Sequence, residues 1–186
     1  MDLSTSVLVV IDMQNGFVRE NSAHVVPVIA DLVQRWQSAG GDTIFTRFFN
    51  RTGSPYERLI HWSQMMNPPQ TDIVDELAPY ASKATAVIDK PGYTLFSPRG
   101  AQVIADGGWR DLIICGLATE SCVCKTAVDT FERNLIPWVL TDACASHAGN
   151  HAHQAGLLVI ERFIGAGQLL TTSQVPPLVP RLHRLP

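Results

Sequence analysis

The sequence predicts an α/β fold of three layers, in which a mostly parallel sheet is covered by helices on both faces. Short, continuous Val/Ile/Leu runs recur along the 186 residues, as in strands that are buried on both sides. Segments with a helical spacing of apolar residues lie between these runs. Such alternation of strand and helix is typical of a doubly wound sheet with right-handed crossovers.

The predicted strands are bounded by small or polar residues. Four apolar runs are strong candidates and two are weaker: residues 7–11, 84–88, 112–115 and 136–140, then 43–49 and 168–171. Asp12 directly follows the first run, and Asp89 and Lys90 follow the second. Because the carboxyl ends of parallel strands meet at one edge of a sheet, these side chains are expected near one another.

Three helices are predicted between the strands. The first spans about Val25 to Trp36, with Pro27 in its first turn and Gly40 and Gly41 closing it. The others cover residues 123–131 and 155–163. Residues 50–69 follow neither period, and we expect them to form a lid or a partner surface.

The chain shows no internal repeat, low-complexity tract or long linker, so residues 1–186 are predicted to form a single domain. The tail from Pro176 to Pro186 carries four prolines and is expected to lie along the surface. Before this tail, predicted strands and helices alternate regularly along the chain, which leaves no obvious boundary for a second domain.

Composition argues against several classes of function. The net charge is −3 and the 14 Lys and Arg residues are dispersed, which gives no electrostatic case for binding nucleic acid or an anionic membrane. No apolar stretch approaches the roughly 20 residues of a membrane span. The first residues lack a basic segment followed by an apolar one, so we expect a cytoplasmic protein with its four cysteines reduced.

Cys122 joins Asp12 and Lys90 at the predicted sheet edge, because it follows the 112–115 strand at the start of a helix. A helix N-terminus and a nearby ammonium group both favour a thiolate. Asp12 is suited to hold the lysine charged and to move a proton to and from the thiol. The loop from Gly116 to Ser121 can direct backbone N–H groups at an oxyanion.

Each of the three residues also has an ordinary structural interpretation. A buried cysteine usually packs as a small hydrophobe, an aspartate after a strand often caps a turn, and a lone lysine is usually solvated. Only their joint placement indicates a catalytic site, with Cys122 as the nucleophile.

Four segments in the same order resemble the isochorismatase-like cysteine hydrolases, a superfamily that includes nicotinamidases and N-carbamoylsarcosine and ureidoacrylate amidohydrolases. They are residues 8–17 (LVVIDMQNGF), 87–96 (VIDKPGYTLF), 114–123 (ICGLATESCV) and 141–146 (TDACAS). The resemblance implies a six-stranded sheet and an Asp12-Lys90-Cys122 triad. It also implies hydrolysis of a small-molecule, amide-type C–N bond through a thioester, and a homo-oligomer, dimer or tetramer.

The same resemblance implies a cis peptide between Leu117 and Ala118, and an oxyanion hole formed by the N–H groups of Ala118 and Cys122. In nicotinamidases an Asp-x-His pattern after the second strand binds a metal, whereas this sequence has Phe48 and Asn50 there. Neither is a good ligand for a divalent metal, so no metal and no cofactor are expected.

Substrate contacts are assigned to residues near these motifs: Phe17, Arg47, Phe48, Asn50, Tyr93 and Phe96, with Arg47 as a carboxylate anchor. Tyr56 and Trp62 are expected to line the pocket or an oligomer interface. Simple core packing is the alternative for the aromatic residues. His151 and His153 form a His-x-His pair that, without further ligands, is more typical of a surface.

Three other functions remain as alternatives. One is a vinyl ether hydrolase of the isochorismatase type, although the relatives that do this typically lack the cysteine. Another is a binding or scaffold module on the same fold, against which the intact triad argues. A nucleotide-binding domain would need a Gly-rich loop after the first strand, where only Gly16 is present.

Overall fold

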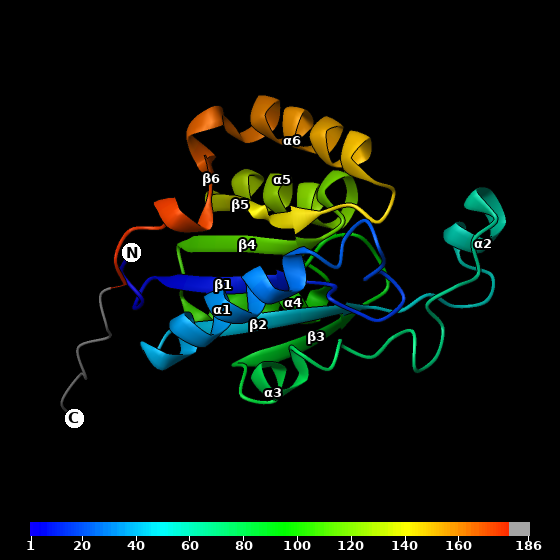
Figure 1. The fold of residues 1–186 in the computed structure, drawn as a ribbon, viewed down its shortest axis with the longest axis horizontal. Helices are drawn as coiled ribbons and strands as arrows, with labels where there is room; N and C mark the ends of the chain where they lie inside the picture. The colour runs from blue at the N-terminus through cyan, green and yellow to red at the C-terminus, as the bar shows by residue number, and fades with distance from the viewer. Residues whose placement is uncertain (179–186) are drawn as a thin grey trace.

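Six parallel strands form one sheet within residues 1–178, the part of the chain that the computed structural model describes (Figure 1). The strands are β1 Ser6–Ile11, β2 Asp42–Phe48, β3 Ala86–Lys90, β4 Asp111–Leu117, β5 Ile136–Ala145 and β6 Leu169–Leu170. Their order across the sheet is β3-β2-β1-β4-β5-β6, and every strand pair in it is parallel. The predicted three-layer α/β fold is confirmed.

Helices cover both faces of this sheet. The buried side chains of α1 (Val25–Ser38) belong to one hydrophobic core, together with Ala81 of α3 (Ala78–Ala81). Side chains of α4 (Pro98–Gly107), α5 (Cys124–Glu132) and α6 (Asn150–Ile164) belong to the second core on the other face. Short 3₁₀ turns, η2 (Ala166–Gln168) and η3 (Thr172–Gln174), flank β6.

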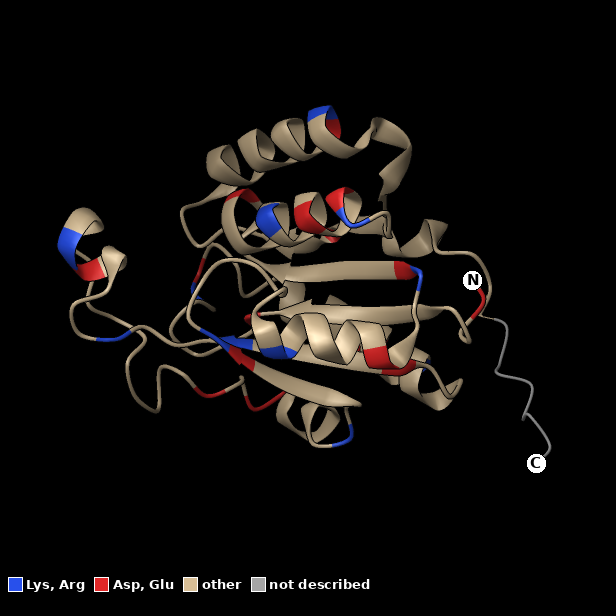
Figure 2. Ribbon diagram, turned by 180° about the vertical axis from the view of Figure 1, so that it is seen from behind, with Lys and Arg blue, Asp and Glu red and all other residues tan. Residues whose placement is uncertain are grey.

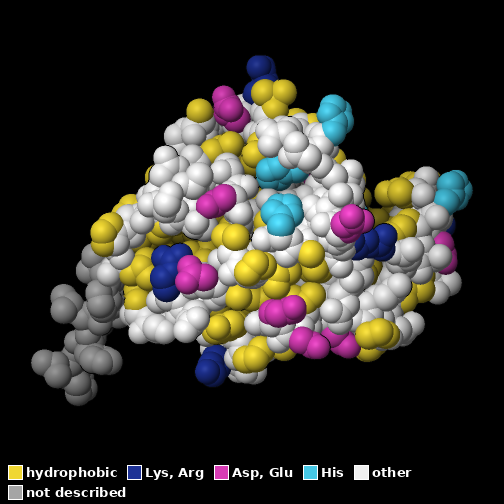
Figure 3. Space-filling view, in the orientation of Figure 1, with side chains coloured by type: hydrophobic (Ala, Val, Ile, Leu, Met, Phe, Trp, Pro, Cys, Tyr) yellow, Lys and Arg dark blue, Asp and Glu magenta, His cyan; other side chains and the backbone are white. Residues whose placement is uncertain are grey.

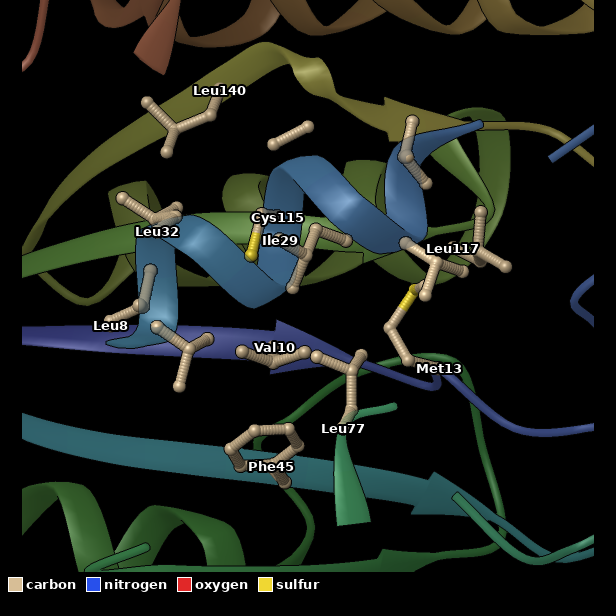
Figure 4. Packing of buried hydrophobic residues seen from close by; sticks show 14 of the residues in the cluster. Leu8, Val10, Met13, Ile29, Leu32, Phe45, Leu77, Cys115, Leu117 and Leu140 are labelled. Carbon is tan, nitrogen blue, oxygen red and sulfur yellow. The ribbon is translucent and has the colours of Figure 1, made fainter. Parts of the chain in front are cut away.

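The first core shows why the apolar periods of the sequence fold in this way. Ile29 and Leu32 of α1 belong to the same buried cluster as Leu8 and Val10 of β1 and Phe45 of β2 (Figure 4). These side chains are almost completely buried. Burying each one stabilises the fold by roughly 1.5–3 kcal/mol relative to leaving it in water.

The structure corrects several element boundaries. The strand predicted at 84–88 lies at Ala86–Lys90, so Lys90 is its last residue, and β5 continues five residues past Leu140 to Ala145. Helix α4 was not predicted from its apolar pattern. Residues 50–69, expected to be irregular, contain α2 (Pro55–Ile60), which stands away from the sheet (Figure 1). The tail predicted from Pro176 onward lies largely outside the described residues.

The functional edge is set by the order of the strands. The chain moves outward from β1 to β2 and β3, then returns to place β4 on the other side of β1, which makes a topological switch point between β1 and β4. Gly116 permits close approach there: its φ is 115°, and a Cβ would lie 2.2 Å from the Ile11 carbonyl oxygen. Ligands of open α/β sheets bind beyond the carboxyl ends of strands at such points.

Lys and Arg residues are scattered over the ribbon and interspersed with acidic ones (Figure 2). Hydrophobic side chains reach the surface in several separate groups, including the segment that carries α2 (Figure 3). Within residues 1–178, no helix is both long and apolar enough to cross a bilayer.

Candidate active site

The strand order brings Asp12, Lys90 and Cys122 together at the carboxyl edge of the sheet. Asp12 follows β1 with a φ of 47°, a left-handed conformation that Asp tolerates better than most residues. Lys90 ends β3 and reaches past the end of β2 toward Asp12. Cys122 lies in η1 (Thr119–Val123), a π-helical turn between β4 and α5. All three side chains are buried.

Lys90 is the centre of the hydrogen-bond network. Its Nζ donates to Asp12 Oδ2 at 2.7 Å, to the carbonyl oxygens of Gly92 and Tyr93 at 3.0 and 3.1 Å, and to Cys122 Sγ at 3.6 Å. Burial is the largest single effect and lowers the pKa of Lys90, but the charges and hydrogen bonds of Asp12 and Cys122 together outweigh it, so the pKa lies above its ordinary value. Lys90 is therefore an ammonium group across the physiological pH range.

Cys122 experiences opposing effects. Burial raises the pKa of its thiol most, the charge of Asp12 raises it further, and Lys90 lowers it. The net pKa is well above that of a free cysteine. Loss of solvent therefore acts against the thiolate that the adjacent ammonium group favours. The resting side chain is a thiol with Asp12 beside it as a proton acceptor.

Two residues that the sequence did not single out support this site: Thr46 holds the Asp12 carboxylate, and Gln14 holds the neighbouring strand end. Thr46 Oγ1 donates to Asp12 Oδ1 at 2.6 Å and accepts from the Asp12 N–H at 3.2 Å. The buried Gln14 side chain joins the ends of two strands, since its Nε2 donates to the Phe48 carbonyl and its Oε1 accepts from the Phe48 N–H. With its oxygens held by Thr46 and Lys90, the carboxylate of Asp12 has one orientation toward the thiol.

The turn that carries Cys122 is held from the outside by α6. Gly156 of α6 packs against it so closely that a Cβ would lie 2.7 Å from both the Cα and the N of Glu120. Thr119 Oγ1 and His153 Nδ1 form a hydrogen bond of 2.7 Å. The peptide bond between Leu117 and Ala118, just before this turn, is cis.

A cavity of about 400 Å³ opens beside Cys122. Its wall is mainly aromatic, and the lining residues are Phe17, Phe48, Tyr56, Ile60, His61, Trp62, Tyr93, Leu117, Ala118, Glu120, Ser121, Cys122 and His147. Three of the predicted substrate residues, Phe17, Phe48 and Tyr93, thus line it together with the oxyanion-hole candidates. The size suits a small organic molecule.

The rings of this wall contact one another in a continuous cluster. Phe17 stacks with both Trp62 and His147, with centroid separations of 6.1 and 5.5 Å. Tyr56 makes edge contacts with Phe48 and Tyr93 at 5.0 and 5.3 Å. The segment 50–69, predicted to form a lid or a partner surface, therefore supplies four lining residues, Tyr56, Ile60, His61 and Trp62.

Three residues predicted to bind substrate lie elsewhere. Arg47 precedes Phe48 on β2, so its side chain points to the opposite face of the strand. There it forms a bidentate ion pair with Asp89, with N–O distances of 2.7 and 2.9 Å. Phe96 belongs to the second core, with the Arg133 guanidinium 4.3 Å from its ring centroid. We therefore remove Arg47 and Phe96 from the proposed substrate pocket.

Asn50 supports the pocket without lining it. Its Oδ1 accepts from Ser54 Oγ at 2.6 Å and its Nδ2 donates to the Trp62 carbonyl at 3.0 Å. Ser54 in turn caps α2 by accepting from the Glu57 N–H. Asn50 therefore holds both ends of the segment that carries Tyr56. Like Arg47 and Phe96, it does not line the cavity.

Glu120 and His147 are polar residues of the cavity that the sequence did not indicate. Glu120 Oε1 accepts from Ser146 Oγ at 2.7 Å, while Oε2 is buried without a hydrogen-bond partner in the described protein. His147 Nδ1 is likewise buried without a hydrogen-bond partner in the described protein. Burial lowers the pKa of His147, as does Arg19, against a smaller opposing effect of Glu120. The imidazole is therefore neutral at pH 7.

The residues at the nicotinamidase metal position do not fit a metal. Phe48 offers a phenyl ring that packs in the aromatic cluster, and the Asn50 amide is occupied by Ser54 and Trp62. Within residues 1–178, no three His, Cys, Asp or Glu side chains are grouped as metal ligands. His153 is instead engaged by Thr119.

Comparison with known proteins identifies the family and supports the fold. The isochorismatase domain family matches residues 6–174. The chain is 25% identical to the ureidoacrylate amidohydrolase RutB of Azorhizobium caulinodans, over 92% of each chain. Its fold is similar to that of two solved structures, each with a TM-score of 0.78. Nicotinamidase PncA of Bacillus subtilis is 22% identical over 89% of this chain and 99% of that one. N-carbamoylsarcosine amidase of Thermoplasma acidophilum is 20% identical over 93% and 99%.

Proposed function

This chain belongs to the isochorismatase family, and we propose that it is a cysteine hydrolase that cleaves an amide-type C–N bond of a small molecule through a thioester. The observation that carries the proposal is the buried contact of Lys90 with both Asp12 and Cys122 beside an aromatic cavity. The amidohydrolase names of the similar proteins support the class of bond.

In the first step, the Cys122 sulfur attacks the substrate carbonyl carbon while Asp12 accepts the thiol proton. The negative charge moves to the carbonyl oxygen, which the N–H groups of Ala118 and Cys122 stabilise in this proposal. Asp12 then protonates the leaving nitrogen, the C–N bond breaks, and an amine or ammonia departs. The acyl group remains on sulfur as a thioester.

Water completes the reaction. Asp12 accepts a proton from a water molecule, the hydroxyl oxygen adds to the thioester carbonyl, and the C–S bond breaks. The sulfur recovers the proton from Asp12 and the acid product leaves. Lys90 stays protonated throughout, and its charge offsets that of Asp12 or of the transient thiolate. Because the resting thiol is protonated, attack and proton transfer are coupled in this scheme.

The alternative of a binding or scaffold module fits the buried charges less well. Taking an ammonium and a carboxylate out of water costs several kcal/mol per ion, and well-packed apolar residues are often at least as stabilising. A module that performs no chemistry gains nothing from placing this pair beside a thiol. The cysteine likewise favours carbonyl chemistry over cleavage of a vinyl ether.

Substitution of the nucleophile tests the proposal. We expect Cys122→Ala to lower turnover of any amide, carbamoyl or ureido substrate by at least about a thousandfold, because no other group there can form the thioester. Cys124→Ala, a change at a neighbouring cysteine outside the cavity, is the control. Release of amine and the acyl-enzyme mass are measured; full activity in Cys122→Ala would refute the mechanism.

Asp12→Asn separates chemistry from binding. An amide at this position keeps the Thr46 hydrogen bond but cannot accept the thiol proton, so kcat is expected to fall by about 10²–10⁴ with a smaller change in KM. Steady-state kinetics across a concentration series give the two constants. A rise in KM with kcat unchanged would assign Asp12 to substrate binding instead.

A further inference from the structure

We infer that Glu120 and His147 form a hydrogen-bonding subsite that selects substrates with a nitrogen donor and disfavours substrates with a carboxylate at the same position. The inference rests on the proposed function and narrows its substrate class to flat amides that carry a second N–H group. Both residues line the cavity next to Cys122, outside the triad.

The subsite is indicated by two buried polar atoms without partners. Glu120 Oε1 is occupied by Ser146, which fixes the carboxyl group and leaves Oε2 as an acceptor. His147 Nδ1 is the second such atom. Buried polar groups are nearly always hydrogen-bonded, and leaving one unpaired costs about 1–3 kcal/mol. A ligand that supplies partners recovers this energy, and a carboxylate oxygen can be paired only by a donor.

The charge around the cavity points to the same ligand class. The described lining residues include Glu120 but no Lys or Arg, and the Arg47 side chain is held by Asp89 on the other face of β2. Lys90 is committed to Asp12 and to two backbone carbonyls. A buried substrate carboxylate near Glu120 would therefore meet a second carboxyl group, with no Lys or Arg among the lining residues to pair with.

The shape of the wall adds the second requirement. Trp62 and His147 are each stacked with Phe17, with interplanar angles of 17° and 23°, so the planes of the three rings are similarly inclined. Flat apolar groups pack well against such a surface. A planar amide whose carbonyl reaches Cys122 and whose second nitrogen reaches Glu120 fits both parts of the cavity.

A matched ligand series tests the inference. We would measure the binding of benzamide, 3- and 4-aminobenzamide, and 3- and 4-carbamoylbenzoate to the full chain carrying Cys122→Ala, by calorimetry. Of the two aminobenzamides, we take the one that binds more tightly. Its dissociation constant is expected to be lower by about tenfold or more than that of the carbamoylbenzoate substituted at the same ring position, as one charge-assisted hydrogen bond implies. Adding Glu120→Gln replaces the free acceptor with an NH₂ group and should abolish or reverse this preference.

Two further variants control the experiment. Glu161→Gln makes the same chemical change on the exposed side of α6 and should leave the preference unchanged. His147→Phe keeps a ring for stacking on Phe17 but removes the Nδ1 atom, and it should weaken aminobenzamide more than benzamide. This second variant keeps the test valid if Glu120→Gln does not fold.

The outcomes separate this inference from the proposed function. Three results would overturn the subsite. The first is an equal preference for aminobenzamide over carbamoylbenzoate with and without Glu120→Gln in the Cys122→Ala chain. The others are tighter binding of the carbamoylbenzoates and no binding by any of the five compounds. If the wild-type chain nevertheless hydrolyses other amides through Cys122, for instance ureidoacrylate, the hydrolase proposal stands without it. Loss of donor preference on Glu120→Gln, with Glu161→Gln unaffected, supports the subsite even before a natural substrate is known.

Discussion

At the scale of single residues, the behaviour of Cys122 depends on a competition between burial and charge. A nearby ammonium group lowers a thiol pKa, and Lys90 Nζ lies 3.6 Å from the sulfur. Removal from solvent acts in the opposite direction and is the larger effect, with Asp12 adding to it. The structure thus favours a neutral thiol whose proton leaves only as the substrate is attacked.

This balance predicts the pH dependence of alkylation. In the absence of substrate, we expect iodoacetamide to label Cys122 slowly up to about pH 8.5, where a free thiol is half ionised, and faster only above that value. Lys90→Met removes the one effect that lowers the pKa of Cys122, so the rise should move to still higher pH. Labelling is followed by peptide mapping, with glutathione as the reference thiol. A plateau below pH 8 in the wild type would contradict this account.

At the scale of elements, the position of the nucleophile depends on contacts between α6 and the η1 turn. Gly156 lets the helix backbone approach Glu120, and His153 from the same helix bonds Thr119 at the start of the turn. The turn carries both Cys122 and Glu120, so a shift of α6 moves the nucleophile and the proposed subsite together. Misplacement by about 1 Å can cost a factor of about 10² in rate.

Gly156→Ala tests this coupling. The added Cβ would lie 2.7 Å from backbone atoms of Glu120, so one element must shift. We expect a loss of about 1–3 kcal/mol in the free energy of unfolding and a reduced kcat/KM. Gly167→Ala is the matched control, since a Cβ there meets no atom within 4 Å. Urea unfolding and steady-state kinetics on both variants provide the comparison; equal effects of the two substitutions would show that the close approach is unimportant.

At the scale of the whole molecule, both cores contain buried thiols. Cys115 lies in the core under α1, whereas Cys122 and Cys144 lie in the core on the other face. Burial raises the pKa of Cys115 well above that of a free thiol and raises the pKa of Cys144 to about 12. All four cysteines are free in the structure. The fold therefore keeps protons on thiols that ionise readily once the chain unfolds.

Stability is consequently expected to fall at alkaline pH. Below the unfolded thiol pKa of about 8.5, folded and unfolded chains bind the same thiol protons, and stability does not change with pH on this account. Above it, the unfolded chain loses protons that the folded chain retains, so each buried thiol lowers the free energy of unfolding by up to about 1.4 kcal/mol per pH unit. The loss continues until the folded pKa is reached.

Urea unfolding at pH 7.5 and 9.5 measures this dependence. Cys115→Ala should show a smaller decrease between the two pH values than the wild type, even if it is less stable at pH 7.5. Because the same Tyr and Lys residues titrate in both proteins, the difference between their slopes isolates the thiol. Identical slopes would mean that Cys115 is not protected from ionisation by folding.

The sequence by itself was sufficient for the fold class and for the three residues at the sheet edge. Continuous apolar runs indicated buried parallel strands, and a residue after or at the end of such a strand must lie at the carboxyl edge. Asp12 and Lys90 were placed together on that ground alone, although 78 positions separate them. Helix α4 was missed because its apolar pattern is short; the Ser97 cap with Pro98 and the left-handed Gly108 were its available signals.

Only the tertiary structure decided which neighbouring side chains face the cavity and how charges behave within it. Alternation along β2 sends Phe48 inward and Arg47 outward, a distinction that depends on how the strand packs. The expected dimer or tetramer stays a prediction. Burial at Cys122 opposes the effect of Lys90 on the pKa of the thiol, and only folding brings Glu120 and His147 to one cavity. Local patterns report periodicity and chemistry, whereas solvent exclusion and side-chain partners arise only when distant segments pack together.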